Sequence, residues 1–283
     1  MTLSSNKKVV RSVGDLEELL TTFEGQIGQD LKPMWFRGQA NMSWDLLPPA
    51  LRKDFISASR NTDRQRAVEE QGLAKEYALL FEFRTRCAQF KVPNDLTQLY
   101  MLARHYGLPT RLLDWSINPL VALFFAVVSQ PNTDGVLFAI NARNLRGTGV
   151  IDAVAEDDRE VCDKIALLFD SERNPSDLRG HCAPKDTNGY ERAGWDAIPI
   201  IPRARDSRMT RQGARFTFHF PGCRGIKRDE PTFIKEWIVP ASDKEALRGT
   251  LRRMGVDWDQ IFPDLDHVVQ SIVETSLPNL NRT

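Results

Sequence analysis

The feature that most constrains the fold is an apolar segment near the middle of the chain. Residues 120–129 are apolar almost throughout, and the preceding Asn118-Pro119 is typical of a helix start, with asparagine as N-cap and proline at the first helical position. A helix that is apolar nearly all round must be covered on every side, so it is predicted to be buried. Residues 135–140, Gly-Val-Leu-Phe-Ala-Ile, follow as a predicted buried strand. Both elements are therefore expected in the core.

The remaining patterns predict an α+β fold. Helix-forming residues with apolar faces occupy 62–89 and 96–105, between a short aromatic strand at 34–36 and a strand at 111–116. Later strands are expected at 198–201, 214–220 and 233–239. We therefore expect a sheet assembled from distant segments, with a helical insertion of about 50–107 after the first strand and an irregular, polar insertion of about 141–197.

Two segments have the pattern of helix caps. Ser12-Val-Gly-Asp15 precedes apolar residues at helical spacing, and Ser242-Asp-Lys-Glu245 has the capping-box pattern before a helix that is expected to stop at Gly255. Both segments are predicted helix starts.

Composition limits the class of protein. The 283 residues are interpreted as a single domain, and Lys plus Arg equals Asp plus Glu at 38 each, which argues against a broad nucleic-acid footprint but leaves a local basic stripe open. The four cysteines and four histidines are scattered without zinc spacing, so no metal site is expected. Scattered thiols, no apolar leader at the N-terminus and no apolar run long enough for a bilayer predict a cytoplasmic protein without membrane contact.

The first candidate for chemistry is Trp35-Phe36-Arg37-Gly38-Gln39. An arginine at the end of an apolar strand usually meets an anion or a carboxylate, and the glycine after it lets backbone groups approach a ligand closely. A pocket for a negatively charged ligand is therefore the first hypothesis. The alternative is a turn glycine beside an arginine that pairs with a structural carboxylate.

The second candidate runs from Arg104 to Pro119. His105 could bind a ribose hydroxyl or act as acid or base, with Tyr106 stacking on a ring, although a histidine at a helix C-terminus is also favoured by the helix dipole. Asp114 and Ser116 share one face of the predicted strand, next to the free N–H groups of the following helix. In the structural alternative they only cap that helix or pair with Arg111.

The late strands add Arg211-Gln212-Gly213 and Glu236. A carboxylate in an otherwise apolar strand is a catalytic candidate, while a surface-facing glutamate is the simpler alternative. The sequence contains no P-loop, no GxGxxG motif and no recognisable nucleophilic triad.

Several of these motifs together resemble the FRG domain, which is named for its (F/Y)-R-G motif. The resemblance rests on residues 36–39, on Trp44–Arg52 with its prolines, on His105–Trp115 and on Gly255–Leu265, and it spans residues from about 30 to 270. The family occurs in prokaryotes and phages, and the resemblance implies a setting of defence or toxicity.

A more distant similarity is to ADP-ribosyltransferases of the arginine–serine–glutamate type. These begin with an aromatic-Arg-Gly strand, continue with a serine strand running into an N-P-x-x-A-x-x-F-A helix, and end with a glutamate strand. The matching positions are Arg37 with Gly38, Ser116 before the helix at 118–126, and Glu236 or else Gln212. The chain has Asp-Trp-Ser where that family has Ser-Thr-Ser, and no E-x-E or Q-x-E occurs near residue 236.

This similarity implies an ADP-ribosyltransferase-like split sheet and NAD as substrate. Arg37 would hold the NAD pyrophosphate or ribose, Gly38 the nicotinamide amide, and Ser116 would position the catalytic carboxylate. Glu236 would engage a ribose hydroxyl, with Asp114 able to take part of that role. A carboxylate there stabilises the cationic sugar left when nicotinamide departs.

The leading expectation is an NAD-dependent ADP-ribosyltransferase or NAD glycohydrolase acting on a macromolecule, as a toxin or phage-defence effector with an antitoxin or operon partner. The alternative from another class is a sensor module in which Arg37, His105 and Arg111 bind a nucleotide without turnover. A nuclease using Asp114 and His105 is a third interpretation, against which the lack of clustered acidic residues for magnesium counts.

Overall fold

A computed structural model of the chain describes residues 8–27, 34–52, 55, 62–90, 92–94, 96–142, 197–202, 207–219, 226 and 234–276. Its strands are β1 (Met34–Gln39), β2 (Leu112–Ser116), β3 (Gly135–Asn141), β4 (Ala197–Ile200), β5 (Ala214–His219) and β6 (Ile234–Val239). Its α-helices are α1 (Val13–Ile27), α2 (Thr62–Arg86), α3 (Leu96–His105), α4 (Pro119–Val127), α7 (Ser207–Arg211), α8 (Lys244–Arg253), α9 (Trp258–Ile261) and α10 (Leu265–Ser276). The predicted irregular insertion of about 141–197 lies almost wholly outside the described residues.

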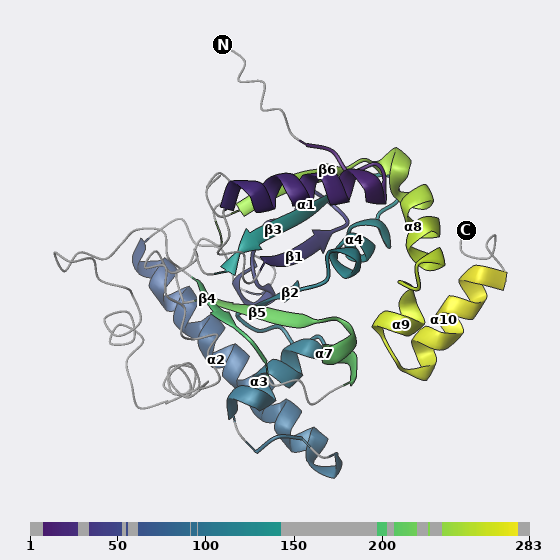
Figure 1. Cartoon of the computed structure of the whole chain (residues 1–283). Helices are drawn as coiled ribbons and strands as arrows, with labels where there is room; N and C mark the ends of the chain where they lie inside the picture. The colour runs from purple at the N-terminus through teal and green to yellow at the C-terminus, as the bar shows by residue number, and fades with distance from the viewer. Residues whose placement is uncertain are drawn as a thin grey trace.

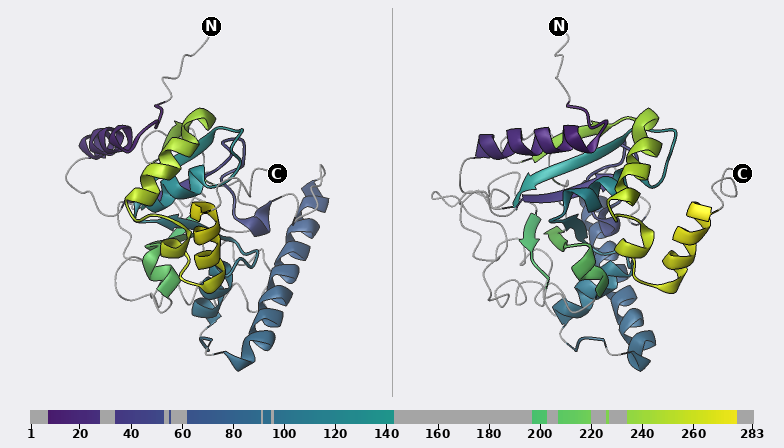
Figure 2. Two further views of the ribbon diagram at one scale, coloured as in Figure 1. Left: turned by 90° about the vertical axis from the view of Figure 1, so that its right-hand side faces the viewer. Right: turned by 45° about the vertical axis from the view of Figure 1, so that its right-hand side comes forward.

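The six strands form one antiparallel sheet in the order β4-β5-β2-β1-β3-β6, and helices lie around it (Figures 1 and 2). The α+β class is therefore confirmed. Strands that are neighbours in the sheet come from distant parts of the sequence. For example, β2 pairs with β5, although about a hundred residues separate the two strands in the chain. The helices α2 and α3 fill the chain between β1 and β2.

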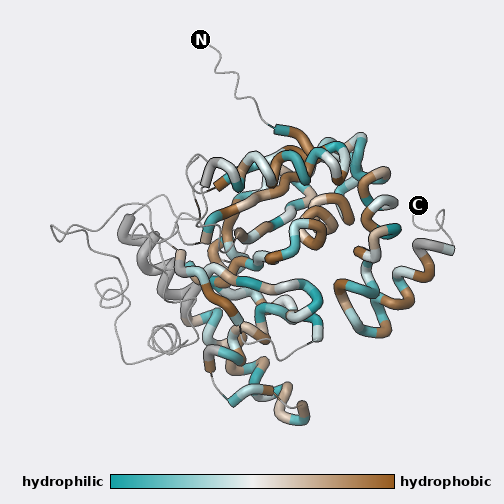
Figure 3. Tube along the Cα trace, in the orientation of Figure 1, coloured by the Kyte–Doolittle hydropathy of each residue, from teal (hydrophilic) through white to brown (hydrophobic). Residues whose placement is uncertain are grey.

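The apolar middle segment forms the centre of one core. All seven residues of β3 are buried, and α4 packs on β1 with most of its residues buried. Figure 3 shows the hydrophobic character of both segments. The side chain of Asn118 accepts a hydrogen bond from the backbone N–H of Leu120 at 2.9 Å, so the predicted cap is present. Both core predictions are confirmed.

The helix α4 lies unusually close to β1 at Gly38. A Cβ at Gly38 would overlap the carbonyl oxygen of Ala122 and lie 2.7 Å from the backbone nitrogen of Ala126. Only glycine permits this packing, because both obstructing atoms belong to the backbone of α4. The glycine of the Arg-Gly motif is thus explained by helix packing, whatever ligand the pocket holds.

The sheet is weakest between its two central strands. β1 and β3 are paired over six residues from Met34 to Gln39, whereas β1 and β2 are paired only at Phe36 and Ser116. The two strands therefore separate on either side of this single pair. Side chains from both can enter the space between them.

A buried ion pair joins α2 to the start of β2. The Arg111 Nε donates to the Glu76 carboxylate at 2.6 Å, and both side chains are almost fully buried. The backbone N–H of Arg111 also donates to Glu76 and to the hydroxyl of Tyr100, which itself donates to Glu76. This network positions the two inserted helices against the sheet.

The two predicted capping segments differ in outcome. Ser12 and Asp15 exchange hydrogen bonds between side chain and backbone N–H at 3.1 and 2.9 Å, so the first box is formed. The second prediction is wrong in detail: α8 begins at Lys244 after a short 3-10 turn, and its N-cap, Asp243, makes no side-chain capping bond. The helix ends as predicted before Gly255, which has φ +77°.

Within the described part of the chain, no helix combines the length and apolar character needed to cross a membrane. The described residues also contain no group of three or more histidine, cysteine, aspartate or glutamate side chains arranged to hold a metal ion.

Candidate functional site

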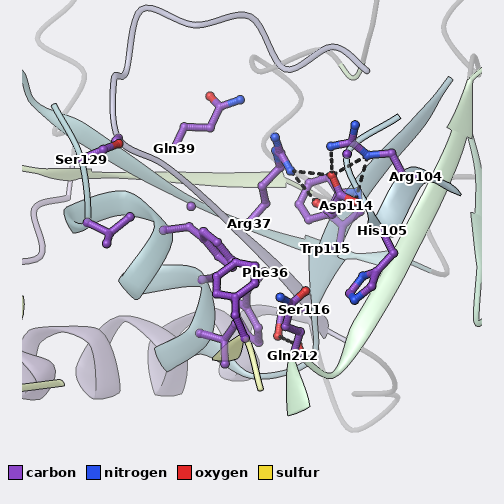
Figure 4. A pocket seen from close by; sticks show the side chains of 18 of the residues that line it. Phe36, Arg37, Gln39, Arg104, His105, Asp114, Trp115, Ser116, Ser129 and Gln212 are labelled. Carbon is purple, nitrogen blue, oxygen red and sulfur yellow. Dashed lines mark hydrogen bonds and ion pairs between the residues drawn. The ribbon is translucent and has the colours of Figure 1, made fainter. Parts of the chain in front are cut away.

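A pocket of about 460 Å³ opens where β1 and β2 separate (Figure 4). Its walls come from β1, β2, the end of α3, α4, α7 and the segment after α9. The polar residues that line it are Arg37, Gln39, Arg52, Arg104, His105, Asp114, Ser116, Ser129, Arg208 and Gln212. The aromatic residues are Phe36, Trp44, Tyr106, Trp115, Phe125 and Phe262. Residues far apart in the sequence thus meet around one cavity.

Arg37 crosses the gap between the two central strands. Its Nη1 donates to the backbone carbonyl of Asp114 at 2.8 Å and lies 3.8 Å from the Asp114 carboxylate. Its Nε is buried and has no hydrogen-bond partner among the described residues. Burial lowers the pKa of Arg37 from its usual value to about 10, with Asp114 acting against this shift, so the guanidinium stays charged at neutral pH.

Asp114 is held from its other side by Arg104. The Nε of Arg104 donates to both carboxylate oxygens of Asp114, at 3.1 Å to Oδ1 and 3.0 Å to Oδ2, and its Nη2 donates to Oδ2 at 2.5 Å (Figure 4). Burial acts to raise the pKa of Asp114, but the charge and hydrogen bonds of Arg104, followed by the charges of Arg37 and His105, bring it below its usual value. The pocket therefore presents an ionised carboxylate between two arginines.

His105 and Tyr106 follow at the end of α3. His105 is the last residue of the helix and is buried, with a side chain that lines the pocket, while Tyr106 lines it with 59% of its surface exposed. His105 thus lies both at the C-terminus of a helix and at the pocket. Its favourable position in the helix dipole therefore does not exclude a role in ligand binding or catalysis.

The hydroxyl of Ser116 acts both as a hydrogen-bond donor and as an acceptor. It donates to the backbone carbonyl of Gln212 at 2.6 Å and accepts from the backbone N–H of Asn118 at 2.9 Å. The serine therefore joins the end of β2 to the turn before β5 and to the start of α4. Gln212 lines the pocket and its side-chain amide donates to the carbonyl of Ile261 at 3.4 Å.

Gln39 lies at the opposite end of the pocket from His105 (Figure 4). Its amide nitrogen donates to the carbonyl of Asp45 at 3.3 Å. Its amide oxygen is buried without a hydrogen-bond partner in the described part of the chain. That oxygen and the Arg37 Nε are two polar atoms at the pocket whose hydrogen-bonding capacity the described protein groups leave unused.

Two of the predicted site residues are not brought to the pocket. Arg111 is only 2% exposed and is committed to Glu76, with its guanidinium carbon 5.0 Å from the ring centroid of Phe218. Glu236 lies on the edge strand β6 opposite Phe138, with β3 between it and β1, and it is not among the lining residues. Of the three candidates for the last catalytic residue, Asp114 and Gln212 line the same pocket as Arg37, and Asp114 alone has a recorded contact with it.

A buried chain of hydrogen bonds lies behind Trp115. Its indole N–H donates to the Thr217 hydroxyl at 3.0 Å, and that oxygen is 2.9 Å from the Nε2 of His219. Burial, and secondly the charge of Arg37, lowers the pKa of His219 from 6.5 to about 3. A neutral histidine therefore supports the pocket wall.

Sequence reasoning assigned no role to several residues that the pocket contains. Arg104 stood at the start of the second motif, in the last turn of a helix and ten residues before Asp114, and a buried arginine in that position could have been paired with it. Trp44 and Arg52 lay in the proline-rich segment after β1. Phe262 lay in the segment Gly255–Leu265, which was part of the resemblance but received no role, and Arg208 carried no local signal. Contacts between α7 and α9 bring these two residues to the site.

Comparison with protein families shows that residues 32–135 match the model of the FRG domain. The matched region contains Arg37, Arg104, His105, Asp114 and Ser116, whereas Gln212, Arg208 and Phe262 are contributed from outside it. Searches of curated proteins and of solved structures give no match, so they lend no support to the similarity with ADP-ribosyltransferases.

Proposed function

We propose that this chain, with its FRG domain at residues 32–135, binds NAD in the pocket and transfers ADP-ribose to a macromolecule or to water. The observation that carries the proposal is the convergence of Arg37, Arg104 and Asp114 on one pocket large enough for a nucleotide. In this interpretation, the weak pairing of β1 with β2, which is limited to one residue pair, is the counterpart of a split sheet.

The arginines provide the site for a pyrophosphate. Arg37 keeps its charge, and its buried Nε is an unused donor among the described groups. A guanidinium can contact a phosphate with two parallel N–H donors, which a lysine cannot do. The aromatic lining, with Phe36 and Trp115 nearby, gives apolar surface for the rings of a dinucleotide.

Asp114 provides the negative charge that the reaction requires. When the bond between the ribose C1′ and the nicotinamide nitrogen breaks, its electron pair leaves with nicotinamide and the sugar becomes cationic. A carboxylate that Arg104 already holds in place stabilises this charge without reorganising. His105, on the same wall, is the group we assign to take the proton of the incoming acceptor.

The biological setting that we propose is a cytoplasmic toxin or phage-defence effector, controlled by an antitoxin or another operon partner. This part of the proposal rests on the FRG domain and on the nature of NAD consumption, which is harmful to a cell.

A second candidate is a sensor that binds a nucleotide without turnover. It is favoured by the placement of Glu236 on β6, outside the pocket, and by the engagement of Asp114 with two arginines. In this alternative Arg104 and Asp114 set the charge of the pocket and no bond is broken.

Incubation of the purified protein with adenine-labelled NAD and a cell lysate tests the proposal. Chromatography measures nicotinamide release, and separation of protein from nucleic acid shows where the label goes. R37A is expected to abolish release, whereas R86A, which changes an exposed arginine on α2, is expected to behave as wild type. NAD binding by calorimetry without any nicotinamide release establishes the sensor instead. Absence of both binding and release ends the proposal.

A further inference from the structure

We propose that the acceptor is single-stranded nucleic acid, bound on an aromatic and basic rim made of Trp44, Arg52, Tyr106 and Arg208. This inference rests on the proposed NAD cleavage for its chemistry, while the binding surface itself stands on separate observations. In the transfer, the ribose C1′ loses its bond to nicotinamide and forms one to a base nitrogen or oxygen, whose proton is released to His105 or solvent.

The two aromatic side chains of the rim are unusually exposed for their residue types. Trp44 is 45% exposed and Tyr106 is 59% exposed, and both line the pocket. The other large exposed apolar side chains of the described residues lie elsewhere. Two flat rings at the mouth of a cavity offer stacking surfaces to bases, and such stacking tolerates any sequence.

An arginine accompanies each exposed ring: Arg208 contacts Tyr106, and Arg52 follows Trp44 in the same segment. The guanidinium carbon of Arg208 lies 5.8 Å from the ring centroid of Tyr106 and 4.2 Å from that of Phe262. Arg52 lies eight residues after Trp44 in the same segment, is exposed, and carries a charge that acts on Arg37. Guanidinium groups beside stacking rings match the alternation of phosphate and base along a single strand.

The pocket lining carries an excess of positive charge, whereas the chain as a whole has none. Four arginines and a single aspartate line it, although Lys plus Arg equals Asp plus Glu over the whole sequence. The four arginines outnumber the single Asp114, so the lining as a whole stays positive. A polyanion is the macromolecule that complements this surface. An acidic peptide would match the charge but would leave the exposed rings unused.

Fluorescence anisotropy with an end-labelled, mixed-sequence 20-nucleotide DNA or RNA strand tests the rim in the absence of NAD. The W44A/Y106A variant is expected to raise the dissociation constant at least about tenfold, because stacking contributes about 1–3 kcal/mol per base. W44F/Y106F keeps both rings and is expected to stay within about twofold of wild type. Y77A removes a tyrosine on α2 that is as exposed as Trp44 but does not line the pocket, and it controls for general effects.

Three results overturn the inference: no binding of single strands, equal loss of affinity in Y77A and in W44A/Y106A, or transfer of the NAD label to protein alone. Nicotinamide release into water, measured without nucleic acid, separates this failure from failure of the proposed function. If nicotinamide release persists while single strands neither bind nor accept label, the proposed NAD cleavage is retained and the proposed nucleic-acid acceptor is rejected. Thermal unfolding of each variant shows whether it is folded.

Discussion

Arg37 and Asp114 meet where the sheet is barely paired: the Nη1 of Arg37 donates to the backbone carbonyl of Asp114 at 2.8 Å, two residues before the single register pair between β1 and β2. The arginine thus links the two strands beside their single register pair and at the same time brings its charge within 3.8 Å of the Asp114 carboxylate. Structure and chemistry at the pocket depend on the same side chain.

The first prediction concerns the guanidinium of Arg37. R37K keeps a positive charge but loses the planar arrangement of donors, so we expect nicotinamide release to fall about 100-fold or more. The measurement is the initial rate at saturating NAD, with thermal unfolding to establish that the variant folds. R86A serves as the control on a solvent-exposed helix. A lysine variant as active as wild type would remove Arg37 from the mechanism.

The second prediction separates catalysis from binding at Asp114. D114N removes a negative charge beside the site proposed for the pyrophosphate, so NAD is expected to bind as tightly as before or more tightly. The cationic sugar loses its stabilising carboxylate, and kcat is expected to fall by about 10²–10³. Steady-state kinetics give kcat and calorimetry gives the dissociation constant of NAD. An unchanged kcat with tighter binding contradicts the catalytic role and favours the sensor.

The third prediction concerns the contact between Gly38 and α4. A methyl group there meets backbone atoms of Ala122 and Ala126 that cannot rotate away, so we expect G38A to lower the free energy of unfolding by at least about 2 kcal/mol. On α1, a Cβ at Gly25 would have no atom within 4 Å, and G25A is expected to raise the free energy of unfolding by up to about 1 kcal/mol. Urea unfolding of both variants compares them. Equal stability of the two would contradict the packing argument.

The fourth prediction compares two glutamates on α2. Glu76 and its partner Arg111 are 1% and 2% exposed, and E76Q leaves a buried guanidinium without its counter-charge, so we expect a loss of about 3–5 kcal/mol in unfolding free energy. Glu82 pairs with Arg86 at a similar distance but in solvent, and E82Q is expected to change it by less than about 1 kcal/mol. Urea unfolding measures both. A small effect of E76Q would place Arg111 outside the structural network.

The elements that could be predicted from the sequence are those with strong local signals. The helix α3 coincides with the predicted 96–105, and Asn118 caps α4 as its sequence context indicated, because capping and apolar spacing act between near neighbours. A shared site for Arg37 and Asp114 was expected only from the similarity to ADP-ribosyltransferases. The order of the six strands was not predictable, since it depends on pairing between segments that the sequence keeps far apart.

The site residues also differ in whether local sequence or long-range contacts determine their role. Arg111 stands three residues before Asp114 and had the same local appearance, yet its partner Glu76 lies 35 residues away on α2. Glu236 was selected by its apolar strand, but the position of β6 at the sheet edge places it away from β1. Arg208 and Phe262 reach the pocket only because α7 and α9 pack together. Tertiary contacts decide these cases.

The last prediction concerns stability at acid pH. His219 is fully buried, and its pKa falls from 6.5 to about 3, first through burial and then through the charge of Arg37. Below pH 6.5 the unfolded chain binds a proton at this histidine that the folded protein does not, so the free energy of unfolding decreases as pH falls, by up to about 1.4 kcal/mol per pH unit. H219Q keeps a group able to hydrogen-bond Thr217 and is expected to flatten this dependence between pH 6.5 and 4.5. Urea unfolding at half-unit steps measures both proteins in that window, which lies above the range where the lowered pKa of Asp114 contributes. The same slope in H219Q and wild type would show that His219 is not the group whose protonation opposes folding.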